Sequence, residues 1–239
     1  IMTLPFSYYD FIEACAEPGC PVCALLLRDA HRYIDSMLYE YVTKPATNEM
    51  FRAARGLCNV HNWHLLEFGA QVLGTAILQD AALDEVLKLM ADNPAQAQSA
   101  LARWLGPTAK NSPAALADKL EPERPCPVCE TVAASERRYL EAINDYLSDE
   151  RFQAAFRDSA GLCLPHVRAT LRQINDAAAL DTFLTLQTTI WRRLKTDLET
   201  FITKNDYRYA GEPMGVERDS WRRAISALAG KRGVFGIRR

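Results

Sequence analysis

The chain carries one pattern of cysteine and histidine twice. Residues 20–23 read Cys-Pro-Val-Cys, and the same four residues recur at 126–129, 106 positions later. Residues 56–61 read Gly-Leu-Cys-Asn-Val-His and recur, 105 positions later, as Gly-Leu-Cys-Leu-Pro-His at 161–166. A repeat of this kind constrains the architecture of the whole chain more strongly than any single predicted helix or strand does. We interpret the chain as two copies of one unit.

Each copy contains the ligands for one metal ion. A Cys-x-x-Cys pair offers two sulfurs on one side of a turn, and a Cys-x-x-His pair offers one sulfur and one nitrogen. Four such ligands close the tetrahedral site that zinc prefers. We therefore predict two Zn²⁺ ions and eight ligands, grouped by copy as Cys20, Cys23, Cys58 and His61, then Cys126, Cys129, Cys163 and His166.

Two questions about these sites stay open at the sequence level. Cys20 and Cys23 can instead close with Cys163 and His166, an exchange between copies that keeps the same ligand count. Iron–sulfur clusters with one histidine ligand are the alternative to zinc. A thioredoxin-type dithiol is a further alternative, but that motif belongs beside a βαβ unit, which this sequence does not predict.

The sequence predicts helices almost throughout. Runs of alternating β-branched residues, which indicate strands, are missing. Proline is favoured at the first position of a helix, so each Cys-Pro-Val-Cys should open one. The expected order in the two copies is a helix over 21–42 or 127–147, a short helix over 48–55 or 149–158, and a long helix over 59–90 or 165–204. The predicted fold class is an all-α duplicated helical bundle with two Cys3His metal sites.

Both halves of each ligand set should lie at helix starts. Gly56 and Gly161 are natural helix stops, so the cysteine that follows each of them should begin the next helix. Free N–H groups and the positive end of the helix dipole lower thiolate pKa values at such positions. Three thiolates and a neutral imidazole around a divalent ion leave one negative charge, which helix N-termini stabilise.

The repeat also divides the chain. We predict a first helical metal-binding repeat over 1–91 and a second over 126–204. Residues 92–125 hold a high density of proline and read as a linker with a short helix over 95–105. Residues 205–239 form a C-terminal arm.

The repeat separates ligands from other histidines. His64 lies one turn after His61, but its counterpart in the second copy is Ala169, so His61 is the expected ligand. His31 corresponds to Arg137 and is expected at the surface.

Charge and composition indicate a cytoplasmic protein. The formal net charge is −2, and Asp10, Glu13 and Glu17 interrupt the apolar residues near the N-terminus, which does not resemble a signal peptide. The most apolar stretch, 65–83, contains too many polar residues for a membrane span. In a reducing compartment, spaced cysteines indicate metal or redox chemistry. Cys15, which has no counterpart in the second copy, is expected to be a core cysteine.

The C-terminal arm is locally basic, with nine basic and four acidic residues from Lys204 to Arg239. Such an arm can bind nucleic acid or an acidic partner. We expect instead that Tyr207, Tyr209 and Trp221 pack onto the helices while the charges stay solvated. Nucleic acid is not an expected partner, because the overall charge is slightly negative and no nucleic-acid-binding motif is present.

These motifs resemble those of a bacterial family of unknown function. Its members share the Cys-Pro-x-Cys and Gly-Leu-Cys-x-x-His elements, a C-terminal Asp-Tyr-Arg-Tyr, here at 206–209, and a Ser-Trp-x-x-Ala-Ile helix, here at 220–225. The resemblance covers most of the chain except the middle linker. It implies a helical, metal-binding bacterial protein and assigns no reaction.

The function expected from the sequence is that of a metal-stapled interaction or regulatory protein with an unidentified protein partner. A closed four-ligand site has no open position for substrate, which is typical of structural zinc. The alternative is an iron–sulfur or thiol-based redox sensor or enzyme. The sequence contains no nucleophile elbow, phosphate loop or His-Glu-x-x-His motif, so catalysis stays an open question.

Overall fold

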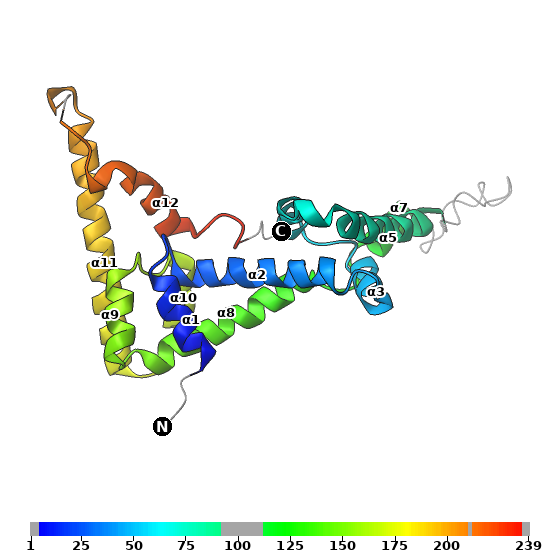
Figure 1. The fold of residues 1–239 in the computed structure, drawn as a ribbon, viewed down its shortest axis with the longest axis horizontal. Coiled ribbons are helices and arrows are strands. Elements are labelled where there is room, and N and C mark those ends of the chain that lie inside the picture. Colours follow the sequence, from blue (N-terminus) through cyan, green and yellow to red (C-terminus); the bar gives the residue numbers. More distant parts are fainter. Residues whose placement is uncertain (1–4, 92–111, 210–211, 236–239) are drawn as a thin grey trace. The chain divides into compact units, whose positions relative to one another are not determined.

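The computed structural model describes residues 5–91, 112–209 and 212–235. Within these ranges the chain forms helices joined by short connections and contains no strand (Figure 1). The predicted all-α class is confirmed. None of the helices in these ranges is long and apolar enough to cross a membrane.

The two predicted copies contain the same order of helices. The first half of the chain forms α1 (Phe6–Cys15), α2 (Pro21–Tyr39), α3 (Pro45–Ala53), α4 (Asn59–His64), the 3₁₀ helices η1 (Leu65–Glu67) and η2 (Gly69–Gln71), and α5 (Val72–Ala91). The second half forms α7 (Pro113–Leu120), α8 (Pro127–Tyr146), α9 (Glu150–Asp158), α10 (Leu164–Leu171), α11 (Ala177–Lys204), the 3₁₀ helices η4 (Tyr207–Tyr209) and η5 (Val216–Asp219), and α12 (Ser220–Ala229).

The two long helices expected over 59–90 and 165–204 are each broken, so that prediction was wrong. In the first, η1 and η2 separate α4 from α5, and the backbone of Phe68 between them leaves the helical region, with φ −98° and ψ 55°. In the second, Asp176 starts α11 as a new helix, because its carboxylate accepts a hydrogen bond from the N–H of Ala179 at 2.7 Å. Local capping and backbone geometry thus interrupt apolar runs that looked continuous.

The segment between the copies differs from expectation where it is described. Helix α7 was not predicted; Ser112 caps it by accepting a hydrogen bond from the N–H of Ala115 at 3.1 Å, and Pro113 occupies its first turn. The short helix expected over 95–105 lies outside the described residues.

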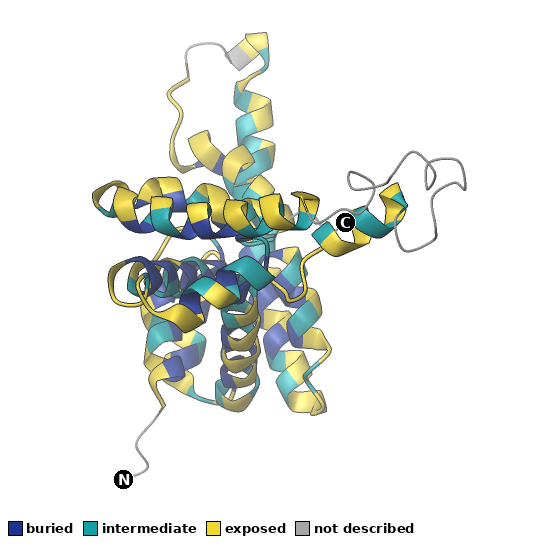
Figure 2. Cartoon of the chain, turned by 90° about the vertical axis from the view of Figure 1, so that its right-hand side faces the viewer, coloured by how far each residue is buried: buried dark blue, intermediate teal, exposed yellow. Residues whose placement is uncertain are grey.

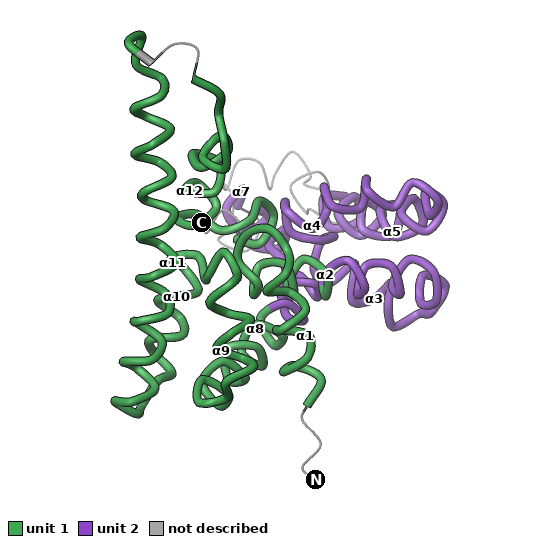
Figure 3. Tube along the Cα trace, turned by 60° about the vertical axis from the view of Figure 1, so that its left-hand side comes forward, with its two compact units in different colours: residues 1–29, 133–239 green, residues 30–132 purple. Residues whose placement is uncertain are grey.

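The chain forms two compact units (Figure 3). Unit 1 comprises residues 1–29 and 133–239, and unit 2 comprises residues 30–132. Helices α2 and α8 each begin in one unit and end in the other, so each unit combines segments of both sequence copies. The division by copies, at 1–91, 92–125, 126–204 and 205–239, is a different partition of the chain and stays a prediction.

Aromatic side chains of α1 and α9 fill much of the core of unit 1. The rings of Phe11 and Phe152 stack with centroids 4.7 Å apart, and both are fully buried. Beside them, the hydroxyl of Tyr8 donates a 2.7 Å hydrogen bond to Oδ1 of Asp149. The same carboxylate oxygen caps α9 by accepting from the N–H of Phe152 at 2.8 Å. Helix α1 is therefore fixed to the start of α9.

A buried glutamine of α11 fixes the turn that precedes α10. The side chain of Gln187 accepts a hydrogen bond from the N–H of Leu162 at 2.9 Å and donates one to its carbonyl oxygen at 3.2 Å. Gly161 has a φ of +70°, and a Cβ atom there would lie 2.9 Å from Nε2 of Gln187. Only glycine suits this position, which explains the turn that the sequence predicted.

The core of unit 2 combines mostly aliphatic side chains with two phenylalanines, Phe51 and Phe68. Side chains of α2, α3, α5 and the start of α8 contribute to it, and the described helices show buried residues on one side and exposed residues on the other (Figure 2). Gly74 lets α5 approach α2 closely, because a Cβ atom there would lie 2.9 Å from the carbonyl oxygen of Leu38. The buried members include Ile34, Met37, Leu38, Phe51, Leu57, Leu65, Phe68 and Leu78.

The expectation that aromatic side chains of the C-terminal arm pack onto the helices was wrong for Tyr207, and the side chain of Tyr209 lies outside the described residues. The side chain of Tyr207 is 85% exposed and that of Trp221 is 43% exposed. Instead, Arg223 lies 2.9 Å from Asp197 of α11, and Lys204 lies 2.7 Å from Glu217. These charges lie within unit 1 and are partly paired rather than free.

Candidate metal centres

Four helix starts supply the predicted ligands. Cys20 and Cys126 directly precede α2 and α8, each of which begins with proline, as expected. Cys58 and Cys163 are the N-cap residues of α4 and α10, with extended backbone angles. Each Cys-x-x-Cys and each Cys-x-x-His pair therefore lies at the positive end of a helix, where free N–H groups stabilise thiolates.

The first cluster lies inside unit 1. It consists of Cys20, Cys23, Cys163 and His166. The Nδ1 atom of His166 lies 3.2 Å from the sulfur of Cys163. It lies 3.4 Å from the sulfur of Cys20 and 3.5 Å from that of Cys23. The sulfurs of Cys23 and Cys163 are 3.7 Å apart.

The second cluster lies inside unit 2 and has the same arrangement. It consists of Cys58, His61, Cys126 and Cys129. The Nδ1 atom of His61 lies 3.2 Å from the sulfur of Cys58. It lies 3.6 Å from the sulfur of Cys126 and 3.4 Å from that of Cys129. The sulfurs of Cys58 and Cys129 are 3.5 Å apart.

These separations suit a tetrahedral zinc ion. Zinc–sulfur bonds of about 2.3 Å and zinc–nitrogen bonds of about 2.0–2.1 Å place two sulfurs about 3.8 Å apart, and a sulfur and a nitrogen about 3.6 Å apart. In both clusters one imidazole nitrogen faces three sulfurs, and the distances differ from these values by a few tenths of an ångström. Both clusters can therefore hold a metal ion with little rearrangement.

The structure answers the open question of how the ligands are grouped. The sets grouped by copy, Cys20 and Cys23 with the 58–61 pair and Cys126 and Cys129 with the 163–166 pair, do not form. The exchanged arrangement forms instead, and each cluster takes its Cys-x-x-Cys pair from one copy and its Cys-x-x-His pair from the other. All eight predicted residues belong to the two clusters.

The path of the chain carries the two ligand pairs of the first copy into different units. Helix α2 begins in unit 1, next to Cys20, and ends in unit 2. It has 19 residues and extends about 28 Å at about 1.5 Å per residue. The segment that follows does not return to unit 1, so Cys58 lies in unit 2, where α8 begins.

Contacts within the first cluster shift the pKa values of Cys20 and His166 in opposite directions. Burial raises the pKa of Cys20, but hydrogen bonds with Cys163, Cys23 and His166 outweigh it and hold this pKa well below the usual range of a thiol. Burial lowers the pKa of His166, but hydrogen bonds with Cys163 and Cys20 raise it to about 11. Both shifts favour the charged form of the side chain, a thiolate at Cys20 and an imidazolium at His166.

The second cluster has the same electrostatic pattern. Hydrogen bonds with Cys126 and Cys129 hold the pKa of Cys58 well below its usual range. Burial lowers the pKa of His61, but hydrogen bonds with Cys126 and Cys58 raise it to about 9. A metal ion requires thiolates and a neutral imidazole, so binding must displace protons from both clusters and weakens as the pH falls.

A carboxylate supports the first cluster. The second ring nitrogen of His166, Nε2, lies 3.3 Å from Oε1 of Glu136 on α8. Carboxylates in this position orient a metal-bound histidine and raise its basicity. The ring of Phe235 lies 5.1 Å from that of His166 and adds an apolar contact. The sequence pattern did not identify Glu136, because it lies outside both motifs.

The two clusters differ in burial. All four side chains of the first are buried, with at most 3% of any of them exposed. In the second, His61 and Cys126 are buried, but Cys58 and Cys129 are only half-buried. Solvent and chelators can therefore approach the second cluster more easily.

A third group of possible ligands lies outside both clusters. His31, His64 and Glu67 form it within unit 2. His31 is exposed, as expected, and His64 is not a member of the second cluster, whose histidine is His61. Burial lowers the pKa of His64, although the nearby carboxylate of Glu67 opposes this effect.

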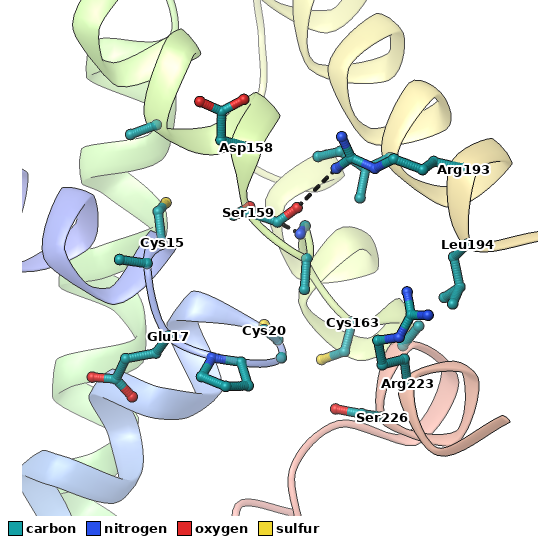
Figure 4. Close-up of a pocket in the computed structure, with 18 of the residues that line it drawn as sticks. Cys15, Glu17, Cys20, Asp158, Ser159, Cys163, Arg193, Leu194, Arg223 and Ser226 are labelled. Atoms are coloured by element: carbon teal, nitrogen blue, oxygen red, sulfur yellow. Dashed lines mark hydrogen bonds between the residues drawn. The ribbon is translucent and has the colours of Figure 1, made fainter. Parts of the chain in front are cut away.

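A pocket of about 710 Å³ opens beside the first cluster in unit 1. Cys20 and Cys163 belong to its wall, together with Cys15, Arg193 and Ser226 (Figure 4). Cys15 is buried, as expected for a core cysteine, and burial raises the pKa of its thiol to about 12. It is therefore not a reactive thiolate, whereas the wall of the pocket includes two cysteines of the cluster.

Comparison with known proteins identifies the family. The model of a family of unknown function, DUF6062, matches residues 10–233, a range that contains both clusters. The chain therefore belongs to this family, and its predicted membership in a family of unknown function is confirmed. No curated protein and no solved structure matches the chain.

The difference in burial predicts the order of metal release. With a zinc chelator and iodoacetamide present, we expect Cys58 and Cys129 to be alkylated before Cys20 and Cys163, because reagents reach half-buried sulfurs first. Mass spectrometry of the peptides over time, beside the optical signal of released zinc, measures both events. Simultaneous labelling of the two clusters, or earlier labelling of Cys20 and Cys163, would contradict this account.

Proposed function

We propose that this member of the DUF6062 family is an interaction or regulatory protein in which one zinc ion staples each of two helical units. By stapling we mean that the ion holds together two helix starts that are distant in the sequence. The observation that carries the proposal is that each Cys3His cluster lies within one unit and joins two helix starts distant in sequence. Sulfurs 140 residues apart meet in unit 1, and sulfurs 71 residues apart meet in unit 2. A metal ion that closes such long loops removes conformational freedom from the unfolded chain.

The ligand set supports a structural role for the metal. Three thiolates and one imidazole complete a tetrahedron and leave no position for a substrate, unlike catalytic sites with three protein ligands. Thiolate ligands also favour zinc over magnesium or calcium, which prefer oxygen. In this proposal the ions hold helices in place, and the function depends on the surfaces that those helices present.

Helix α5 supports an interaction role. At about 100° per residue, five exposed apolar side chains fall on one face, and the buried residues of the helix fall on the opposite face. A helix that is apolar on both faces is typically buried on both. We infer that an apolar surface of a partner protein covers this face, which consists of Val72, Leu73, Leu83, Leu87 and Met90, between 47% and 75% exposed.

One observation favours a second candidate function, that of a redox sensor with an iron–sulfur cluster or reactive thiols. Cys20 and Cys163 belong to the wall of the pocket in unit 1, so a small oxidant that enters the pocket lies beside two cysteines of the cluster, although at most 3% of either residue is exposed (Figure 4). Low pKa values make thiolates reactive, and hydrogen bonds lower the pKa of Cys20. The nature of the bound metal distinguishes the candidates, since zinc is colourless and iron–sulfur clusters absorb visible light.

Metal removal tests the structural role. Anaerobically purified protein should be colourless, contain about two zinc ions per chain, and lose most of its helical circular dichroism when a chelator removes them. Structural zinc contributes about 10–16 kcal/mol of apparent binding energy, which is comparable to or exceeds the stability of about 5–15 kcal/mol typical of a domain. The unit that loses its ion should therefore unfold.

The chain offers a matched control. Cys163→Ala should lose the ion of unit 1, and this unit should then no longer show a cooperative unfolding transition. Cys15→Ala, the same change at a buried cysteine outside both clusters, should retain two zinc ions and this transition. Iron with visible absorption would favour the redox candidate. Full helicity after complete zinc removal would contradict the proposed stapling.

The apolar face of α5 makes a separate prediction. A photoreactive amino acid at Leu87, in protein expressed in its natural host, should cross-link to one discrete second protein. The same amino acid at Glu49, an exposed position of α3, should not. Leu83→Glu should abolish the Leu87 cross-link. It should leave the zinc content unchanged, because Leu83 is 61% exposed and belongs to neither cluster.

Two outcomes would contradict an interaction through this face. One is cross-linking of Leu87 only within the same chain or to a second copy of it. The other is an equal yield of cross-linked products at Glu49 and Leu87.

A further inference from the structure

All four histidines of the chain belong to groups of possible metal ligands. The sequence contains four histidines, and two of them, His61 and His166, complete the Cys3His clusters. The other two, His31 and His64, meet each other and Glu67 in unit 2, with the three ligand atoms within 4.8 Å of one another. The repeat did not predict this group, because it has no counterpart in the second copy.

Three different elements supply the group. His31 lies on α2, His64 ends α4, and Glu67 ends η1. Glu67 follows His64 by about one helical turn, as an i,i+3 pair, so their side chains lie on the same side of this segment. Nε2 of His64 lies 3.2 Å from Oε2 of Glu67, and the rings of His31 and His64 have centroids 5.8 Å apart.

The orientation of the histidine rings is supported by packing. The ring of His31 stacks on that of Phe68, with centroids 4.4 Å apart and an angle of 26° between the planes. Phe68 is buried in the core of unit 2, so it provides a fixed surface for His31. The side chain of His64 is only 12% exposed, whereas that of Glu67 is 67% exposed. Two ligands are thus held by packing, and the third reaches them from the solvent side.

The separations are close to those of a metal site. Zinc bonds of about 2.0–2.2 Å to nitrogen and oxygen place an imidazole nitrogen and a carboxylate oxygen about 3.4 Å apart in a tetrahedron. The observed 3.2 Å between His64 and Glu67 is close to this value. Rotation of the exposed Glu67 side chain and a small shift of the His31 ring across the face of Phe68 can bring the remaining separations, all within 4.8 Å, to the same range.

The chemistry of the group differs from that of the two Cys3His clusters. Two imidazoles and one carboxylate provide three ligands and leave at least one coordination position to water or an added ligand. No thiolate is present, so the group suits zinc, copper, nickel or cobalt rather than an iron–sulfur cluster. A site of this kind exchanges its metal readily, because it is open to solvent.

We propose that His31, His64 and Glu67 bind a third, exchangeable divalent transition-metal ion with an open coordination position. This inference goes beyond the proposed stapling role and does not depend on it, because the ligands belong to neither Cys3His cluster. Because this site exchanges its ion, its occupancy can report metal availability, and the open coordination position lets the ion polarise a bound small molecule. The ions of the two Cys3His clusters have no open coordination position.

Cobalt titration tests the third site. Protein that already contains two zinc ions is titrated with Co²⁺, and weak d–d absorption should saturate at about one further equivalent without sulfur-to-cobalt charge transfer. Calorimetry of the same protein with Zn²⁺ should show one additional binding event. The absence of sulfur-to-cobalt charge transfer distinguishes binding through nitrogen and oxygen from binding at the two sulfur-containing clusters.

Exposed positions provide the variants. His31→Ala and Glu67→Gln should each weaken binding of the third ion at least about tenfold, as loss of one of three ligands implies, and should leave the two zinc ions and the helical signal intact. Glu49→Gln, which removes an exposed carboxylate of the same unit elsewhere, should bind the third ion as the unaltered chain does. Absence of a third binding event, equal binding by the ligand variants, or charge-transfer absorption in its place would each overturn the proposal.

Discussion

The exchange of ligand pairs between distant helix starts is the constraint on which the rest of the structure depends. In each unit, a Cys-x-x-Cys pair that opens a long helix faces a Cys-x-x-His pair that opens a short one. Proline after the first cysteine and glycine before the third place these four side chains at N-terminal ends, where the backbone stabilises negative charge. The two helix starts must approach within bonding distance of one ion, so the path of the intervening helices is restricted.

Much of the fold and most of the site follow from short sequence patterns. The helix starts at Pro21 and Pro127, the glycine stops and the eight clustered side chains were all predicted from residues within a few positions of one another. Such features depend on local backbone geometry and ligand chemistry. The grouping of the ligands depends instead on where α2 and the segment after it carry the chain, a distance that no local pattern records.

The features that the sequence did not predict share this long-range origin. Glu136 of α8 approaches His166 of α10, and Glu67 of η1 approaches His31 of α2, in both cases between elements that are distant in the sequence. Tyr207 is exposed although its aromatic ring suggested packing, whereas Arg223 and Phe235 of the same arm contact Asp197 and His166. Residue type alone does not determine these contacts.

The three ligand groups form a series of increasing solvent exposure, from a fully buried Cys3His set to a half-buried one and to an open group of histidines and a carboxylate.

The metal content of two double variants tests the exchanged pairing most directly. Cys20→Ala with Cys163→Ala removes two ligands of one cluster and should leave about one zinc ion per chain, whereas Cys20→Ala with Cys58→Ala disrupts both clusters and should leave almost none. Native mass spectrometry counts the ions on each chain. The opposite result, an ion retained when Cys20 and Cys58 are removed together and none when Cys20 and Cys163 are removed, would show that each copy closes its own site and would contradict this account.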